Sequence, residues 1–369
     1  MKAVAKSRLL TRLDAAIAKT RNPVEAACLR VERAGFLARH GHFDKARSEL
    51  AAVHAQFDPH PQAAVSVWLC IAEAWVLHFS SLSAMARDKM MRAQALSAAA
   101  GLTQLQALSA AWLAHIAYSN DDIEGTVSYL SMALKLAAPD NHGARARACL
   151  VVALAYHFVE RLDRAQPWYA RAREHATTEG DDTTLSALSH NMTGNRVHHA
   201  MQAAVFGGDT QGQARRALAG AESTRNFDEW IGTVSLDSFV PMQRAAIASV
   251  QGHYGQALAL YEKHMADALK QGLGRWASNY LADIAWCRWH LGDIAGARRD
   301  ASAAAAGISA AMHMDDQAVA HGRLALLFKL LEEDAEAFAQ GAKARECWAA
   351  HRKFQGHVLD LLDQAQLRP

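Results

Sequence analysis

The feature that most constrains this chain is a helix-breaking glycine followed two residues later by a large apolar residue, a pairing that recurs along the sequence. The fullest copy is Gln251–His264, in which Gly252 precedes Tyr254 and the apolar positions Ala257 and Tyr261 follow. Spacings of three and four residues place side chains on one face of a helix. The segment therefore predicts a turn followed by the second helix of a helix–turn–helix unit.

The pattern repeats with a period of about 40 residues. Comparable anchors stand at Phe43, Ile123, Leu162 and Ile294, and weaker copies lie near residues 83, 208 and 333. Tyr254 and Ile294 are 40 positions apart, and Ile123 and Leu162 are 39 apart. Stacked helical hairpins have periods of this size, because each hairpin buries its apolar face against its neighbours. We therefore predict about eight hairpins.

These repeats resemble the tetratricopeptide repeat (TPR). The longer period, and the Ala-rich second helices that end in Ala-Gly at Leu96–Gly101 and Ala303–Gly307, are similar to the variant in the sensor domain of the maltose-regulon activator. The resemblance covers most of the chain, from about Pro23 to Arg352. It implies an all-α fold, namely a right-handed α-solenoid of about eight helix–turn–helix repeats that forms a TPR-like superhelix.

Length and composition agree with such a fold. A chain of 369 residues would otherwise suggest two or three globular domains, whereas a solenoid grows by adding units. Good helix formers are abundant and only 7 Pro interrupt the chain. The formal net charge of +2 gives no indication of a nucleic-acid partner. The 5 Cys are far apart, which predicts buried reduced thiols in a cytoplasmic protein rather than a disulfide framework or a zinc site.

The N-terminal segment Met1–Arg21 is basic and amphipathic, and it lacks the continuous apolar run of a signal peptide. It is interpreted either as a transit peptide or as a helix that caps the repeat stack, and Asp14 favours the cap. We find no apolar run of membrane-spanning length and expect no membrane association. The expected parts are a capping helix over 1–22, a first repeat sub-stack over 23–223, an irregular connector over 224–238, a second sub-stack over 239–343 and a C-terminal capping helix over 344–369.

In a TPR-like stack the first helix of each pair lines the inner, concave wall. Its inward positions stand at fixed distances before the anchor of the second helix. Counting back fifteen, eleven, eight, five and four residues selects a set rich in aromatic residues and His, with a few Asn, Gln and Arg. We therefore predict a partner-binding groove lined by Trp68, Trp75, His78, His115, Tyr118, Arg147, His157, Asn191, Asn195, His198, His199, Gln202, Asn279, Asp283, Trp286, Trp289 and His290.

These residue types suit the recognition of an extended peptide. Asn and Gln each carry a donor and an acceptor, so one side chain pairs with one peptide unit. Trp and Tyr offer a large rigid contact area, and Arg147 is suited to a carboxylate. Two pairs four residues apart, Asn191 with Asn195 and Asn279 with Asp283, resemble the Asn pairs of kinesin light chains and of the peptide-pheromone receptors of Gram-positive bacteria. Asp283 departs from that pattern.

The tryptophans also have a structural interpretation. Trp112, Trp168 and Trp348 stand at helical spacing and are expected in the core. For Trp286 and Trp289, a place in the core and a place in the groove are both open.

The histidines and paired acids have alternatives as well. A stripe of His at positions 78, 115, 157 and 198 either makes binding pH-dependent or is solvated polarity at a groove edge. Adjacent His198 and His199 point about 100° apart on a helix and chelate poorly, and no third ligand is evident. We therefore expect no metal and no cofactor. The acidic pairs at 181–182 and 315–316 are expected to be charges at helix N-termini.

The sequence lacks H-E-x-x-H, G-x-S-x-G, a Walker-type loop and a strand-borne G-x-G-x-x-G, so we expect no enzyme.

The first hypothesis is a non-enzymatic scaffold that captures a protein or peptide segment in the groove. The alternative is a sensory TPR module that binds a small ligand or peptide and controls a transcription or cyclic-dinucleotide signalling partner. A groove open along its length favours the scaffold, and a closed one favours the sensor. The oligomeric state stays open.

Overall fold

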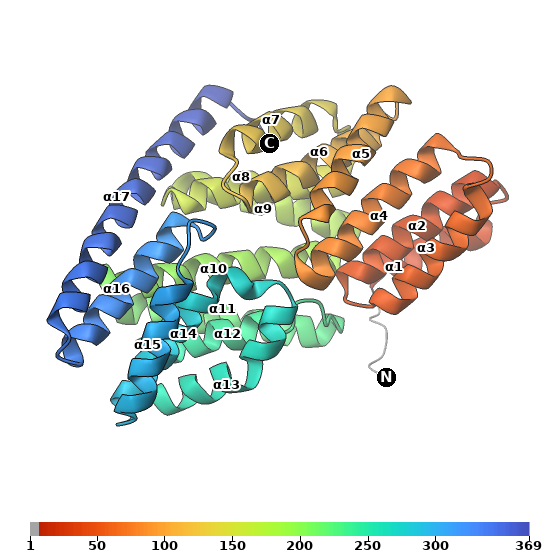
Figure 1. Cartoon of the computed structure of the whole chain (residues 1–369). Coiled ribbons are helices and arrows are strands. Elements are labelled where there is room, and N and C mark those ends of the chain that lie inside the picture. Colours follow the sequence, from red (N-terminus) through yellow and green to blue (C-terminus); the bar gives the residue numbers. More distant parts are fainter. Residues whose placement is uncertain (1–6, 369) are drawn as a thin grey trace. The chain divides into compact units, whose positions relative to one another are not determined.

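The computed structural model describes residues 7–368, which form helices and turns without a strand (Figure 1). The helices are α1 (Arg8–Lys19), α2 (Pro23–Arg39), α3 (Phe43–Phe57), α4 (Ala63–Ser81), α5 (Met85–Ala99), α6 (Thr103–Tyr118), α7 (Ile123–Leu136), α8 (His142–Phe158), α9 (Leu162–Glu179), α10 (Asp182–Phe206), α11 (Thr210–Ile231), α12 (Phe239–Val250), α13 (Tyr254–Lys270), the short 3₁₀ helix η1 (Leu273–Trp276), α14 (Ala277–His290), α15 (Ile294–Gly307), α16 (Met314–Leu330) and α17 (Asp334–Ala365).

Helices α2 to α17 form eight consecutive helix–turn–helix pairs, from α2–α3 to α16–α17, which confirms the all-α repeat prediction. The repeat anchors open the second helices at Phe43, Ile123, Leu162, Tyr254 and Ile294. Three of the turns before these helices contain a glycine with φ between 83° and 87°, a region that L side chains rarely adopt. These glycines are Gly41, Gly252 and Gly292.

Two of the expected parts of the chain, the connector and the C-terminal capping helix, differ from the helices of the structure. The expected irregular connector over 224–238 is helical as far as Ile231, because neither Gly nor Pro interrupts α11 between Thr224 and Gly232. The expected separate helix over 344–369 is the second half of α17, which runs unbroken for 32 residues because no Pro interrupts it. The expected division into sub-stacks at 224–238 stays a prediction.

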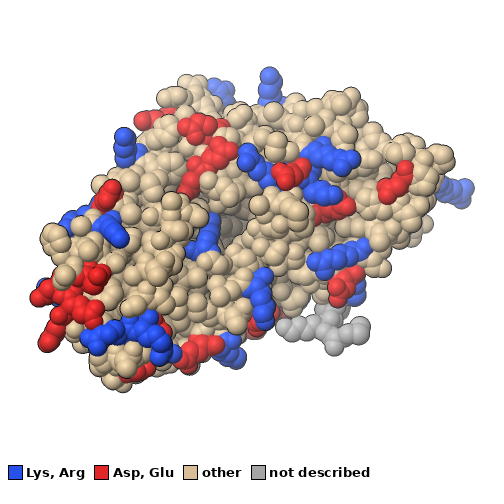
Figure 2. Space-filling model, in the orientation of Figure 1, with Lys and Arg blue, Asp and Glu red and all other residues tan. Residues whose placement is uncertain are grey.

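The described helices group into two compact units. Unit 1 comprises residues 7–188, 226–236 and 358–368, and unit 2 comprises residues 189–225 and 237–357. Acidic and basic side chains are interspersed on the face drawn in Figure 2. That face therefore carries no extended patch of one charge of the kind that binds a nucleic-acid backbone.

The core of unit 1 is built from the first helices of the pairs, α2, α4, α6 and α8. Their large apolar side chains are almost fully buried, among them Val31, Phe36, Ile71, Leu113, Leu150 and Leu154. The second helices contribute small residues such as Ala46, Ala86 and Ala165, which are also buried. A methyl group lets two helix backbones approach closely, so the Ala-rich second helices pack tightly on the first helices.

Helix α4 corrects one expectation. Its 19 residues are apolar and long enough to cross a membrane by length and composition, although we had found no such run in the sequence. Half of its most apolar window is buried inside the protein, and Val65, Ile71 and Ala72 are fully buried. A core helix of a folded domain meets the same criterion, so this length and composition are weak evidence for a membrane span.

The turn after α11 belongs to unit 1. The backbone N–H of Val234 donates to the carbonyl oxygen of His40 at 3.0 Å, and the hydroxyl of Thr233 donates to the same oxygen at 3.4 Å. The hydroxyl of Ser235 donates to the carbonyl of Phe79 at 3.5 Å. This turn therefore satisfies carbonyl groups at the ends of α2 and α4, which a helix leaves without internal partners.

The core of unit 2 contains a buried polar centre. Asp283 of α14 is 1% exposed, accepts a hydrogen bond from the hydroxyl of Tyr261 at 2.9 Å and forms an ion pair with Nε of Arg323 at 3.0 Å. The guanidinium of Arg323 also lies 4.8 Å from the ring centre of Trp286. A buried carboxylate with these partners joins α13, α14 and α16.

One glycine tests the packing of unit 1. A Cβ on Gly35 of α2 would lie closer to Cε3 of the buried Trp75 than two carbon atoms can approach. We expect Gly35→Ala to push this indole and lower the free energy of unfolding by about 1–3 kcal/mol. The matched control is Gly143→Ala in α8, where the nearest atom, Cδ1 of Leu108, is 3.8 Å away, and we expect a change of at most about 1 kcal/mol. Equal urea midpoints for both variants would contradict the close packing at Gly35.

Candidate functional site

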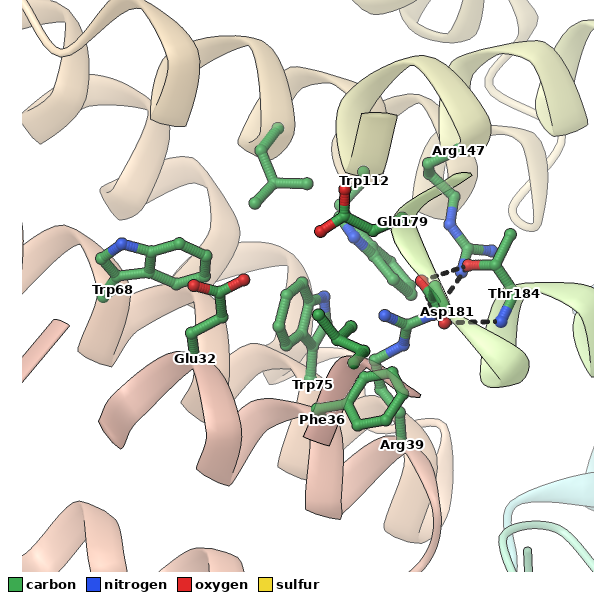
Figure 3. A pocket seen from close by; sticks show the side chains of 13 residues that line it. Glu32, Phe36, Arg39, Trp68, Trp75, Trp112, Arg147, Glu179, Asp181 and Thr184 are labelled. Carbon is green, nitrogen blue, oxygen red and sulfur yellow. Dashed lines mark hydrogen bonds and ion pairs between the residues drawn. The ribbon is translucent and has the colours of Figure 1, made fainter. Parts of the chain in front are cut away.

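Unit 1 contains a pocket formed mainly by the first helices of four consecutive pairs (Figure 3). About 450 Å³ of space, part of it open to solvent, lies between the lining residues. We call it the unit-1 pocket. It is lined by Leu9, Glu32, Phe36, Arg39, Trp68, Trp75, Leu108, Trp112, Gly143, Arg147, Glu179, Asp181 and Thr184.

Aromatic rings form much of the wall of the unit-1 pocket. The ring centres of Trp68 and Trp75 are 6.4 Å apart, and those of Trp75 and Trp112 are 5.5 Å apart. Trp75 and Trp112 are 4% and 2% exposed, so their positions are fixed by packing. Rings held in this way offer a rigid apolar surface to a ligand with little loss of side-chain entropy.

Arg39 is held by a network at the start of α10. Its Nη2 lies 3.0 Å from Oδ1 of Asp181 and donates to the hydroxyl of Thr184 at 2.7 Å. Asp181 accepts from the backbone N–H of Thr184 at 2.9 Å and from the hydroxyl of Thr183 at 2.7 Å, and so caps α10. These donors and the charge of Arg39 hold the pKa of Asp181 below its usual value despite burial.

Arg147 is different, because its charge has no such network. Its side chain is 3% exposed, and its guanidinium carbon lies 3.9 Å from the ring centre of Trp112. Nε and Nη2 are buried and have no hydrogen-bond acceptor among the described residues. Burial and the nearby charge of Arg39 lower the pKa of Arg147 to about 9, so it stays charged at neutral pH. A buried charge without a partner is costly, which is why such groups mark functional sites.

The unit-1 pocket also contains acidic groups. Figure 3 shows Glu32 beside Trp68 at one end and Arg147 beside Trp112 at the other. Glu179 forms an ion pair with Arg12, outside the pocket lining. Burial and the charge of Glu179 raise the pKa of Glu32 to about 7, so this carboxyl group is partly protonated near neutral pH.

Two histidines lie against the aromatic wall. The rings of His78 and His115 lie 6.0 and 5.7 Å from the ring of Trp112 and 5.6 Å from each other. Burial, with the charge of Arg147 as a further cause, lowers the pKa of His78 to about 4 and that of His115 well below its usual value. Both rings are therefore neutral at physiological pH, and Arg147 is left as the cation without an ionic partner in this part of the site.

A solved structure shares this architecture. The crystal structure of a Rap protein complexed with competence and sporulation factor matches with a TM-score of 0.54 and 11% sequence identity, covering 94% of this chain and 92% of that chain. The fold is a TPR-like helical repeat. No protein-family model and no curated protein sequence matches the chain. At this identity the match describes the fold, and the resemblance to the maltose-regulon sensor variant stays a prediction.

Within unit 1 of this TPR-like fold, the predicted groove residues fall into two groups. Trp68, Trp75 and Arg147 line the unit-1 pocket, with His78 and His115 next to Trp112. Two others make structural contacts. The hydroxyl of Tyr118 donates to the carbonyl of Leu154 at 3.4 Å, and the buried ring of His157 lies 3.0 Å from the hydroxyl of Tyr169.

Within unit 2, the polar groove residues on α10 are half-buried: Asn191, Asn195, His198, His199 and Gln202. The amide nitrogen of Asn195 is buried and has no acceptor within residues 7–368, whereas that of Asn279 donates to the carbonyl of Asp316 at 2.9 Å. Asp283 is committed to the buried pair with Arg323 and Tyr261, which explains why an acid replaces Asn in this pair.

The aromatic residues predicted for the groove in unit 2 pack in part against other side chains. Trp286 and Trp289 are half-buried against the core cluster around Leu324 and Leu327. His290 is exposed and stacks on Tyr254 with ring centres 4.0 Å apart. Of the other tryptophans, Trp112 and Trp168 are buried and Trp348 is half-buried, stacked on Phe206.

His198 has the carboxylate neighbours that the sequence did not reveal. Its Nε2 lies 2.8 Å from Asp315 and its Nδ1 lies 3.8 Å from Asp316, at the start of α16. One ligand atom from each of the three residues lies within 4.8 Å of the others, a spacing that a metal ion would also accept. The close contact is accounted for by an ion pair. The charges of both carboxylates raise the pKa of His198 to about 9, and the charge of His198 lowers that of Asp315.

Several pocket residues were missed from the sequence. Glu32 and Arg39 stand eleven and four residues before Phe43, and Trp112 stands eleven before Ile123, so the inner-wall count includes all three. The predicted groove leaves out the first pair, and Trp112 is expected in the core. Asp181, which was assigned to the helix N-terminus, does cap α10 and also pairs with Arg39. Its partner on α2 is 142 residues away, and nothing in the spacing indicates it.

Proposed function

We propose that this chain is a non-enzymatic, peptide-binding helical-repeat protein that takes a partner segment onto the inward faces of its first helices. The observation that carries the proposal is the unit-1 pocket, in which rigid indole rings stand next to buried donors that have no acceptor. Peptide recognition uses this combination of apolar area and hydrogen-bond donors. The Rap protein of similar fold is complexed with competence and sporulation factor, which supports a binding role rather than a catalytic one.

In this proposal each unit contributes its own contact residues. Trp68, Trp75 and Arg147 act in unit 1, and the half-buried polar residues of α10, with Asn195 central among them, act in unit 2. Trp286, Trp289 and His290 add aromatic surface in unit 2.

The second candidate is a sensory module that binds a small ligand and controls a signalling partner. The partial enclosure of the unit-1 pocket favours it, because thirteen residues surround a limited volume. A compact molecule fills such a space more completely than an extended chain does. The two candidates share the pocket and differ in what enters it.

The proposal is tested by passing a pool of random heptapeptides over immobilised protein and identifying the retained peptides by mass spectrometry. We expect Trp68→Ala, at the half-buried rim of the pocket, to reduce retention at least fivefold, since truncating one interface aromatic costs more than about 1 kcal/mol. Trp230→Ala is the matched control, because Trp230 of α11 is 77% exposed and lines no part of the pocket. The double variant Asn195→Ala with Trp289→Ala tests the contact residues of unit 2, and we expect it to reduce peptide retention as well. Retention no greater than on the urea-unfolded chain would overturn the peptide-binding proposal.

A further inference from the structure

The buried polar atoms of the unit-1 pocket that have no partner are all donors. They are Nε of Arg39, Nε1 of Trp75, and Nε and Nη2 of Arg147. A buried donor without an acceptor costs free energy, and a ligand that supplies the acceptor recovers that cost. The pocket therefore matches a ligand group that only accepts hydrogen bonds.

The two orphan donors of Arg147 have a particular geometry. Nε and Nη2 lie on the same edge of the guanidinium plane, so their N–H bonds point in parallel in one direction. A carboxylate presents two oxygens at the matching spacing, and such bidentate pairs are the strongest and most specific contacts that arginine makes. The ring of Trp112 covers a face of the guanidinium at 3.9 Å, so an acceptor for these two donors has to lie in the guanidinium plane.

The other charged residues of the pocket determine how much negative charge a bound ligand can carry. Asp181 neutralises Arg39 at 2.9 Å, and Glu179 is paired with Arg12. Arg147 therefore supplies a single uncompensated positive charge, with the carboxyl group of Glu32 at the far end of the pocket. A dianion such as phosphate would exceed this single positive charge. A monoanion fits.

The remaining walls specify the rest of the ligand. Trp75, Trp112, Phe36 and Leu108 surround the space next to Arg147 with aromatic and aliphatic surface. From these observations we propose that the unit-1 pocket binds a carboxylate on an apolar body, with the carboxylate on the Nε–Nη2 edge of Arg147 and the apolar part on Trp75 and Trp112. This inference rests on the proposed binding function. Its ligand is either the C-terminal carboxylate of a peptide with an apolar last residue or a free monocarboxylic acid.

The first arm of the test uses a panel of aromatic and branched aliphatic monocarboxylates, each beside its primary amide, with binding measured by calorimetry. We expect the wild-type protein to bind at least one acid of the panel ten or more times more tightly than its amide. Arg147→Met is expected to abolish that preference, and Arg147→Lys to retain part of it, since the charge remains while the fork is lost. Arg173→Met in α9 is the matched control, an exposed arginine expected to behave as wild type.

The second arm distinguishes the two sources of the carboxylate with two pools of random heptapeptides, one with free and one with amidated C-termini. Selective retention of free-ended peptides by wild type, lost in Arg147→Met, identifies a peptide C-terminus. Acid preference without peptide retention identifies a small acid, so the carboxylate site stands and the peptide-binding proposal fails. Equal retention of both pools, together with no acid-over-amide preference in the first arm, would leave the peptide-binding proposal standing and overturn the carboxylate site. Absence of any acid-over-amide preference in both arms, with unchanged circular dichroism and melting temperature in the variants, overturns it as well.

Discussion

Replacing His198 with Gln is expected to lower the free energy of unfolding by about 3–5 kcal/mol, because it removes the cation that lies against the buried carboxylate of Asp315. Nε2 of His198 lies 2.8 Å from Asp315, and both Asp315 and Asp316 are less than 9% exposed. The measurement is urea denaturation followed by circular dichroism at pH 6. The control is His253→Gln in the same unit, an exposed histidine for which a change below about 0.5 kcal/mol is expected.

The same ion pair predicts a pH dependence with a definite sign. The pKa of His198 is raised from 6.5 to about 9, so its contribution is fully present below pH 6.5 and is lost as the pH rises through 9. The pKa of Asp315 is lowered from 3.8, so its contribution is present above pH 3.8 and is lost in acid. We expect the difference between wild type and His198→Gln to be largest between these limits and to shrink by about 3 kcal/mol between pH 6.5 and 9. A difference that does not change with pH would contradict a charged His198.

Replacing Glu32 with Gln is expected to stabilise the protein by about 3 kcal/mol above pH 7 and to have little effect near pH 4.5. The pKa of this carboxyl group is raised from 4.5 to about 7 by burial and by the charge of Glu179. The folded state therefore holds a proton that the unfolded chain releases, and wild-type stability falls as the pH rises through this interval. The difference between the two pKa values corresponds to about 3 kcal/mol of stability. Gln has the shape of the protonated acid and does not ionise, so the variant does not lose this stability as the pH rises.

The matched control for Glu32→Gln is Glu346→Gln, an exposed position in the middle of α17. It is expected to leave the urea midpoint within about 0.5 kcal/mol of wild type at each pH. Parallel pH profiles for wild type and Glu32→Gln would show that Glu32 is hydrated in the folded protein. The pocket would then be wetter at that end than its burial indicates.

The repeat architecture was predictable from the sequence because it rests on local signals. A glycine turn followed by an apolar anchor at Phe43, Tyr254 or Ile294 fixes where a second helix begins, whatever packs against it. The period of about 40 residues then determines the pairing of neighbouring helices. Where local signals are weak the prediction was less good. Helix α11 continues to Ile231 and α17 runs through the expected boundary at 344, because no proline interrupts either segment.

The site was predictable only in part, for a physical reason. The helical count selects inward-facing positions such as Trp75 and Arg147, but it says nothing about which of them find partners. Arg39 meets Asp181 across 142 residues of sequence, and Asp283 meets Arg323 in the core of unit 2. Whether a charged side chain is neutralised in this way or left with open donors depends on tertiary contacts. That difference separates Arg39 from Arg147, although both carry the same group.

Hydrogen–deuterium exchange with and without a retained ligand tests most directly whether the unit-1 pocket is where this protein binds. A ligand on Arg147 and the indole rings would slow exchange in the helix segments that line the pocket. We therefore predict ligand-induced protection concentrated in residues 32–39, 68–75, 108–112, 143–147 and 179–184. Protection confined to residues 189–225 and 237–357, with exchange in those five segments unchanged, would contradict the account.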